Sequence, residues 1–311
     1  MNKVRYKYLE TICNLVETGE NIVLVSSDYA APVLDDFRIK HSDRYVSVGI
    51  AEQNLIQVAC GLSLSGQRSI AYGMAPFPCI RAVDQIRNAV AMMNTPISII
   101  SAGVGFAIPE FGATHYCTED VSIMRTMPNF RIINLTDEAM AEKAAKLSLT
   151  TDEPLYIRID KYSDSNYYQE KDIDFSRGFS VVKEGSSDII VIVSGYYTDR
   201  MLKLSDKLYQ HGIDIKIIDL YSLPFNSDEL IDEIGNCNNI LTVEEHVREG
   251  GIGTAVLEAL SDRGIYKSIK RMGIDFNGKY TSEFGSREYF MKKYHLDDAS
   301  IEEEINNMMR K

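Results

Sequence analysis

Short apolar segments alternate with helical patterns along most of this chain, and this alternation limits the folds open to it. The segment at residues 21–27 is apolar at consecutive positions, which is typical of a strand covered on both faces. Segments of the same kind follow at residues 67–72, 96–101, 131–135 and 154–160. Stretches with helical periodicity lie between them. Regular alternation of this kind predicts a parallel α/β sheet.

A polar stretch at residues 161–178 interrupts the alternation, lacks periodicity and is interpreted as a linker with some local strand pairing. New strand and helix units then begin at residues 188–194, 213–219 and 239–244. The sequence therefore predicts two consecutive parallel-sheet α/β domains. We expect them to cover residues 1–170 and 187–311, with a linker at residues 171–186.

Charge and composition exclude several classes of protein. The 311 residues carry a net charge of -12, with 45 acids against 33 bases and no basic stripe, which argues against nucleic-acid binding. No apolar run approaches the length of a membrane span, and no signal peptide is expected after the charged first residues. The five cysteines are scattered without CxxC spacing, so neither a disulfide framework nor a zinc site is expected. A cytoplasmic location is the resulting prediction.

The stretch at residues 45–54 places a single acid, Glu52, at the start of an apolar helical pattern. No Lys or Arg stands on the same helical turn. Partial loss of hydration favours the neutral form of a carboxyl, which suits an acid that holds or transfers a proton. The alternative is an ordinary helix-start glutamate stabilised by the helix dipole.

Two further polar residues follow predicted strands. Asp28 comes after the strand at residues 21–27, at the carboxyl end where open α/β sheets bind ligands, although it could equally cap a loop or helix. His115 lies in a glycine-rich loop after the strand at residues 96–101. A loop histidine there is a candidate for proton transfer, and a surface position is the competing interpretation.

Arg158 and Phe77 are candidates for ligand binding, and for each of them a purely structural role is the alternative. Arg158 interrupts an apolar strand, so it either binds a phosphate or carboxylate or forms a buried ion pair. Phe77 stands between two prolines and could stack on a ring ligand, or it could simply pack in the protein.

The glycines at residues 250–253 do not form a dinucleotide fingerprint, because the sixth position of the pattern that begins at Gly251 is Val256 and not glycine. No P-loop is present. We expect these glycines to allow close packing or a tight helix start.

The order of several motifs resembles the transketolase family of thiamine diphosphate enzymes, over about residues 5 to 300. The motifs are Gly-Ile-Ala-Glu-Gln-Asn at 49–54, Arg-Ala-Val-Asp-Gln-Ile-Arg at 81–87, Gly-Ala-Thr-His at 112–115 with Glu-Asp at 119–120, Val-Glu-Glu-His at 243–246, Gly-Gly-Ile-Gly at 250–253 and Glu-Phe-Gly-Ser-Arg at 283–287. The first of these is the most specific.

The resemblance covers only half of a full transketolase. The other half of such an enzyme holds the diphosphate through Mg²⁺ with a Gly-Asp-Gly segment and a later Asn, and no Gly-Asp-Gly occurs here. The resemblance therefore implies the small subunit of a split transketolase, with a pyrimidine-binding domain and a C-terminal domain. It implies thiamine diphosphate as cofactor, Mg²⁺ held mainly by an N-terminal partner subunit, homodimerisation through this chain and an α2β2 heterotetramer. No metal ligand is expected in this chain.

The resemblance also implies roles for the cofactor-binding residues. Glu52 matches the catalytic glutamate that hydrogen-bonds N1′ of the aminopyrimidine, while the cofactor carries out the carbanion chemistry. Gln53 and Arg81 belong to the cofactor-binding motifs. Phe77 is the best match for the aromatic residue that stacks on the pyrimidine, and Asp28 matches an acid near the thiazole.

At the substrate, His115 matches a catalytic histidine near the donor carbonyl and Arg158 matches the arginine that grips a sugar phosphate. Ser101 stands where the family usually has a histidine, and Phe111 where it usually has an aspartate that touches sugar hydroxyls. These departures imply an altered donor or acceptor, and we expect a specialised sugar pathway.

The leading hypothesis is a transketolase subunit that transfers a two-carbon ketol unit between phosphorylated or otherwise activated sugars. One alternative is the beta subunit of a 2-oxo acid dehydrogenase. Another is a non-catalytic assembly or regulatory subunit that has kept the fold.

Overall fold

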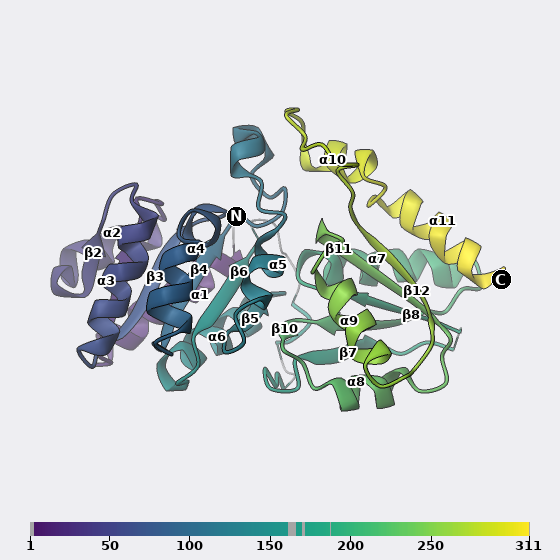
Figure 1. The fold of residues 1–311 in the computed structure, drawn as a ribbon, viewed down its shortest axis with the longest axis horizontal. Helices are drawn as coiled ribbons and strands as arrows, with labels where there is room; N and C mark the ends of the chain where they lie inside the picture. The colour runs from purple at the N-terminus through teal and green to yellow at the C-terminus, as the bar shows by residue number, and fades with distance from the viewer. Residues whose placement is uncertain (1–2, 161–165, 170–171, 187, 311) are drawn as a thin grey trace. The chain divides into compact units, whose positions relative to one another are not determined.

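The computed structural model describes residues 3–160, 166–169, 172–186 and 188–310 (Figure 1). The chain divides into two compact units, Met1–Val104 with Ile123–Ile173, and Gly105–Ser122 with Asp174–Lys311. Each unit contains a mostly parallel sheet with helices packed on it, so the predicted fold class of two consecutive parallel-sheet α/β domains is confirmed. The predicted end of the first domain at residue 170, the start of the linker at residue 171 and the start of the second domain at residue 187 lie outside the described residues.

The strands of the first unit are β1 (Ile22–Ser26), β2 (Tyr45–Ser47), β3 (Arg68–Met74), β4 (Ile97–Ala102), β5 (Arg131–Asn134) and β6 (Leu155–Ile159). They lie in the order β5-β6-β4-β3-β1-β2, and all these neighbours pair in parallel. Every residue of β1, β4 and β6 is buried, as expected for strands covered on both faces. Parallel pairing brings the carboxyl ends of these strands to one edge of the sheet.

The helices of the first unit are α1 (Lys3–Glu17), α2 (Val33–Lys40), η1 (Ser42–Arg44), α3 (Glu52–Leu64), η2 (Phe77–Arg81), α4 (Val83–Gln85), η3 (Ile86–Ala91) and α6 (Glu138–Thr150). Helix α1 packs on α6, where the hydroxyls of Tyr8 and Ser148 share a hydrogen bond of 2.8 Å. Helix α3 packs on β3. Helix α5 (Asp120–Arg125) begins in the second unit and ends in the first.

The strands of the second unit are β7 (Phe179–Lys183), β8 (Ile189–Val193), β9 (Lys216–Leu220), β10 (Ser222–Leu223), β11 (Asn239–Val247) and β12 (Ser268–Ile274). One sheet has the order β12-β11-β8-β9-β7. Its neighbours are parallel except for β7, which pairs with β9 in the antiparallel sense at the sheet edge. An edge position accepts an antiparallel strand because that strand needs no crossover on a sheet face.

The helices of the second unit are η4 (Pro109–Phe111), η5 (Ala113–His115), α7 (Tyr196–Gln210), α8 (Ser227–Ile234), α9 (Ile252–Ser261), α10 (Arg287–Lys293) and α11 (Asp298–Met309). Figure 1 draws α10 and α11 in yellow at the end of this unit. The predicted close packing at residues 250–253 is confirmed: the Glu244 carboxylate accepts the backbone N–H groups of Ile252 and Gly253 at the start of α9. A Cβ on Gly251 would lie 2.1 Å from that carboxylate, so only glycine fits.

Three local features differ from the sequence-based expectation. Helix α2 and strand β12 were not expected at all. The helical stretch expected between the strands at residues 67–72 and 96–101 instead contains two π-helical segments, η2 and η3, around the short α4. Within the described part of the chain, no helix is long and apolar enough to cross a membrane.

Candidate active site

Glu52 is the first residue of α3 and its side chain is only 3% exposed. The turn before it uses Gly49 at φ 69°, a left-handed conformation that favours glycine. This turn directs the chain from β2 into α3 and places the carboxylate at the positive end of the helix dipole. The predicted burial of the carboxyl is therefore observed.

A cation that sequence periodicity did not reveal accompanies Glu52. Arg81, at the end of η2, places Nη1 2.6 Å from Oε2 of Glu52. The same guanidinium lies over the half-buried ring of Phe77, with Cζ 4.3 Å from the ring centroid. Glu52, Arg81 and Phe77 thus form one contiguous cluster, in which a charge-assisted hydrogen bond from the arginine reaches the buried carboxylate.

A row of positions crosses the carboxyl edge of the sheet in the same unit. Gly73 of β3 is in register with Ser101 of β4, and Ser101 is in register with Arg158 of β6. Side chains at neighbouring positions of parallel strands project from the same face. The structure therefore brings Ser101 and Arg158 together, and both are buried, at 0% and 7% exposure.

Ser27 extends this row and was missed in the sequence. It follows β1, and its backbone N–H donates to the carbonyl of Tyr72 at 3.1 Å. A Cβ on Gly73 would lie 2.7 Å from Ser27 Oγ and 2.6 Å from Pro78 Cγ, so glycine makes room for both. Among the described residues, the buried hydroxyls of Ser27 and Ser101 have no hydrogen-bond partner. Such groups are costly to leave unpaired unless a ligand or water completes them.

The other two candidates of this unit are exposed. Asp28 follows Ser27 at φ 59°, a conformation that aspartate tolerates, and its side chain is accessible. Gln53 lies in the first turn of α3 with its side chain in solvent, whereas that of the preceding Glu52 is inside. Asp28 has the better placement for ligand contact, because it stands at the carboxyl end of a parallel strand.

His115 belongs to the second unit and ends the one-turn helix η5. It is half-buried, its Nδ1 lies 3.0 Å from the Thr114 hydroxyl, and its ring is 5.1 Å from that of Phe111. The next residue, Tyr116, donates from its phenol to the Glu283 carbonyl at 2.9 Å. Burial raises the pKa of Tyr116, which keeps the phenol protonated for this bond.

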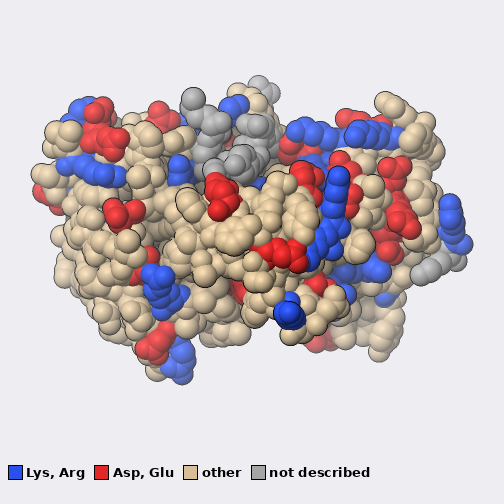
Figure 2. Space-filling model, turned by 90° about the horizontal axis from the view of Figure 1, so that it is seen from above, with Lys and Arg blue, Asp and Glu red and all other residues tan. Residues whose placement is uncertain are grey.

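The charge distribution matches the composition. On the face drawn in Figure 2, basic and acidic side chains are interspersed and the basic ones form no continuous stripe. Within the ranges that the structure describes, no group of three or more His, Cys, Asp or Glu side chains is arranged to hold a metal ion.

Sequence reasoning also missed the partners that hold the His115 segment. Glu245 of β11 and Arg287 of α10 form a buried ion pair, and Glu245 accepts the N–H of Phe106 at 2.8 Å. Both residues lie in motifs noted above only as landmarks. Glu245 gave a signal of the same kind as Arg158, a charged residue within a largely apolar strand pattern, whereas Arg287 begins a helix and gave none.

Two consecutive α/β units, with a buried glutamate at the start of a helix beside the first parallel sheet, fit the expected pair of a pyrimidine-binding and a C-terminal transketolase domain. The family model for the transketolase pyrimidine binding domain matches residues 3–163, and the model for the transketolase C-terminal domain matches residues 178–301. The chain therefore belongs to the transketolase family. The prediction of a transketolase-type transferase is confirmed at this level.

Individual proteins are similar over almost the whole chain. A protein of Methanocaldococcus jannaschii described as a putative transketolase C-terminal section is 29% identical, covering 99% of this chain and 96% of its own length. One subunit of the apulose-4-phosphate transketolase of Phocaeicola vulgatus is 28% identical, covering 96% of this chain and 94% of its own. A solved structure described as a split gene transketolase, inactive beta4 tetramer, superposes with a TM-score of 0.83 at 27% identity, covering 99% of this chain and 98% of that one.

Proposed function

We propose that this chain is the small subunit of a two-chain transketolase, which transfers a two-carbon ketol unit between phosphorylated or otherwise activated sugars. The observation that carries the proposal is the buried Glu52 at the start of α3, within the most specific motif of the family. The similarity to proteins named as a C-terminal section and as one subunit of a transketolase supports a two-chain enzyme. In this proposal, residues 1–170 form the pyrimidine-binding domain, residues 171–186 the linker and residues 187–311 the C-terminal domain.

The first unit fits the pyrimidine half of thiamine diphosphate. It offers a buried carboxylate, an aromatic ring beside it and two buried hydroxyls that lack a partner among the described residues. Glu52 would hold a proton at N1′ of the pyrimidine and Phe77 would lie against the ring, with the more exposed Gln53 and Arg81 at its margin. Asp28 would lie near the thiazole. When bound, the cofactor supplies the carbon that takes up the two-carbon unit.

Arg81 occupies the position at Phe77 and Glu52 where the cofactor ring would bind. Its guanidinium covers one face of Phe77 and pairs with Glu52. Arg81 would have to leave that face if a ring stacked there, and Glu52 would then face the ring nitrogen in place of the guanidinium. We propose that Arg81 keeps the buried carboxylate paired until the ring arrives.

Three residues would act on the sugar. His115 would stabilise or move a proton at the donor carbonyl, and Arg158 would bind the sugar phosphate. Ser101, in register with Arg158, would offer a hydroxyl where the family usually has an imidazole. Two relatives are named for apulose-4-phosphate and 6-deoxy-6-sulfo-D-fructose, which supports a specialised sugar for this chain too.

The partner would be an N-terminal subunit that carries the diphosphate and Mg²⁺ site, in an α2β2 heterotetramer with homodimerisation through this chain. The description of one similar structure as a beta4 tetramer supports self-association of subunits of this type. The cytoplasmic location stays a prediction from composition.

Substitution of Glu52 by Gln tests the function directly. In the complex of this chain with an N-terminal subunit, Glu52→Gln should lower kcat for ketol transfer by roughly 10²- to 10⁴-fold, because an amide cannot hold the proton. Steady-state transfer from a ketose phosphate to an aldose measures the effect. Glu138→Gln is the matched control, since Glu138 also lies in the first turn of a helix of the same unit. If Glu52 served only the helix dipole, the two variants would behave alike.

The rival functions give different results in the same assay. Full transfer activity in Glu52→Gln would overturn the catalytic role and favour a subunit that only assembles. Decarboxylation of pyruvate without any ketose turnover by the wild-type complex would identify a 2-oxo acid dehydrogenase subunit instead.

A further inference from the structure

The segment Gly105–Ser122, called here the His115 loop, is held by residues of the C-terminal unit. It leaves β4 in the first unit, but its own contacts group it with Asp174–Lys311. An antiparallel bridge closes it, with Gly105 N–H to Cys117 O at 2.8 Å and Cys117 N–H to Gly105 O at 3.0 Å. His115 lies just inside this closure, so the geometry of the bridge fixes where its backbone stands.

The Glu245 carboxylate is the main anchor at the first end of the loop. Its Oε1 accepts the backbone N–H of Phe106 at 2.8 Å. Gly105 has φ 63°, and a Cβ there would lie 2.8 Å from Cδ of Glu245. Glycine is therefore required at residue 105 by both backbone conformation and contact with the carboxylate.

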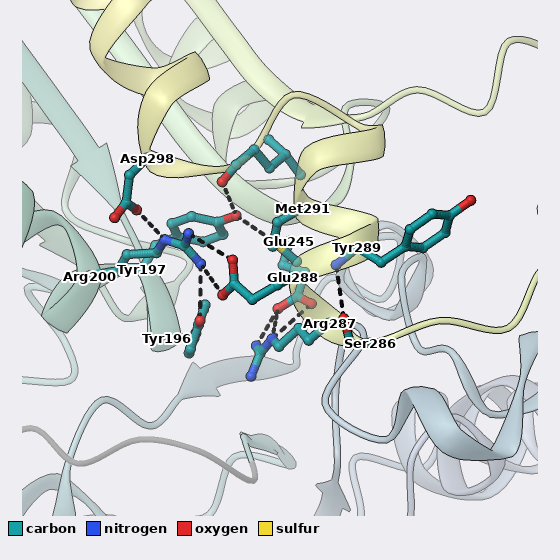
Figure 3. A network of polar contacts seen from close by, with 11 residues as sticks. Tyr196, Tyr197, Arg200, Glu245, Ser286, Arg287, Glu288, Tyr289, Met291 and Asp298 are labelled. Atoms are coloured by element: carbon teal, nitrogen blue, oxygen red, sulfur yellow. Dashed lines mark hydrogen bonds and ion pairs between the residues drawn. The ribbon is translucent and has the colours of Figure 1, made fainter.

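Arg287 holds that carboxylate in place. Its Nε lies 3.1 Å from both carboxylate oxygens of Glu245, its Nη2 makes a further contact, and both side chains are 8% exposed. The Arg287 guanidinium also lies over the ring of Tyr196, with Cζ 3.5 Å from the centroid. Figure 3 shows the pair between β11 and α10, with the Arg200 network beside it. A buried ion pair with this geometry fixes orientation more than it adds stability.

Apolar contacts complete the anchor. The buried Phe106 ring stacks on Phe290 of α10 at 4.6 Å and meets Tyr116 edge-on at 5.0 Å. At the far end of the loop, the Thr118 carbonyl accepts the N–H of Val247 at 2.8 Å, which ties the loop to the end of β11. Both flanks of His115 are thus attached to β11 and α10.

We infer that Glu245, oriented by Arg287, is a positioning residue that fixes the His115 loop for the transfer reaction. The inference rests on the proposed role of His115. Neither residue needs to touch the substrate: Glu245 acts through the Phe106 N–H, and the bridge at Cys117 transmits that position to His115. The C-terminal unit would then contribute to catalysis by holding a loop.

Hydrogen exchange of the full chain tests the anchor without any partner. Glu245→Ala should accelerate exchange of peptides covering residues 105–118 by roughly tenfold to a hundredfold, because it removes a charged acceptor from a buried N–H. Glu245→Gln keeps an acceptor oxygen and should show a smaller acceleration. This milder variant decides the matter if Glu245→Ala does not fold.

Arg177→Ala is the matched control. Arg177 lies in the same unit, pairs with Glu229 and Glu233 and lies over the ring of Phe179, with no contact to the loop, β11 or α10 among the interactions described. Its loss should accelerate exchange in α8 but leave residues 105–118 unchanged. Unchanged exchange of the loop in both Glu245 variants would overturn the inference.

The catalytic consequence is measured in the complex with a double-mutant cycle. If Glu245 acts through His115, the loss of kcat in Glu245→Gln should shrink at least several-fold in a His115→Asn background. Losses that multiply independently would overturn the inference, since a merely structural defect is additive. Full activity of His115→Asn alone would instead overturn the proposed role of His115, whereas the exchange result would still report whether the anchor exists.

Discussion

Glu52 is a buried carboxylate whose charge is balanced by one half-exposed arginine. Its side chain is 3% exposed, whereas that of Arg81 is 43% exposed. The pair therefore lies at the boundary between interior and solvent. In the proposed function, an incoming ring would replace the arginine without leaving the cation buried and unpaired. A fully buried pair would oppose that exchange.

Phe111 supplies the clearest prediction at the scale of single residues. Its ring is 53% exposed and lies 5.1 Å from the His115 ring, where the family usually presents a carboxylate to sugar hydroxyls. Phe111→Asp should raise kcat/KM for a fully hydroxylated ketose donor by about tenfold, the value of one good hydrogen bond to a charged group. Steady-state kinetics of the complex with that donor measure it.

Phe111→Ala separates the two possible causes of such a gain. It removes the ring without supplying an acceptor, so it should not reproduce the increase. An equal gain in both variants would show that the aromatic ring only obstructs the site. A loss of activity in Phe111→Asp would contradict the role assigned to this position.

At the scale of elements, a single side chain at the start of α6 binds backbone N–H groups of two different segments. Asp137 caps this helix, accepting the N–H of Met140 at 2.9 Å, and it also accepts the N–H of Tyr168 at 2.6 Å. Burial raises the pKa of the Asp137 carboxyl, although the N–H donors oppose that effect. Asp137→Ala should lower the free energy of unfolding by about 2 kcal/mol or more, because a cap is lost and a second buried N–H is left unpaired.

Urea unfolding followed by circular dichroism measures this loss. Asn226→Ala is the matched control, because Asn226 caps α8 through the N–H of Glu229 but serves no second element among the described contacts. It should cost about 1 kcal/mol. Asp137→Asn should fall between the two, since the amide keeps one acceptor but turns its NH₂ toward one of the donors. Equal losses in both alanine variants would refute the double role.

The elements show where prediction from sequence succeeds and where it ends. Strands such as β1, β4 and β6 could be predicted because continuous apolar runs report burial on both faces. Strand β12 could not, because its first four residues alternate between exposed and half-buried positions and carry two charges. The π-helical turns of η2 and η3 depend on tertiary packing, which no helical period encodes.

Some features of the candidate site could likewise be predicted from the sequence, and others could not. The burial of Glu52 and Arg158 followed from polar residues within apolar patterns. The Arg81 partner of Glu52 did not, because the two residues are separated by 29 positions and meet only in the folded sheet. The hydroxyl of Ser27 could not be identified from the sequence either. It has room beside β3 only because Gly73 has no Cβ.

At the scale of the whole molecule, the first unit would, in the proposed function, supply the partners for the pyrimidine of the cofactor, whereas no Gly-Asp-Gly segment for the diphosphate occurs in the sequence. A two-chain enzyme should therefore divide the binding free energy between its chains. Each charged hydrogen bond to the diphosphate is worth about 1.5–3 kcal/mol, and these bonds would be made by the partner. The isolated chain should lack them all.

This division predicts how the chain responds to two ligands. In the presence of Mg²⁺, the isolated chain should bind thiamine and thiamine diphosphate with similar, weak affinity, because nothing in it would distinguish the diphosphate. The complex should bind thiamine diphosphate at least roughly 100-fold more tightly than the isolated chain does, which corresponds to about two charged hydrogen bonds. Isothermal titration calorimetry measures both, and Glu52→Gln should weaken binding of the two ligands to the isolated chain equally. Tight, Mg²⁺-dependent binding of the diphosphate by the isolated chain would contradict the split of the site, because it would require a diphosphate and metal site within these 311 residues.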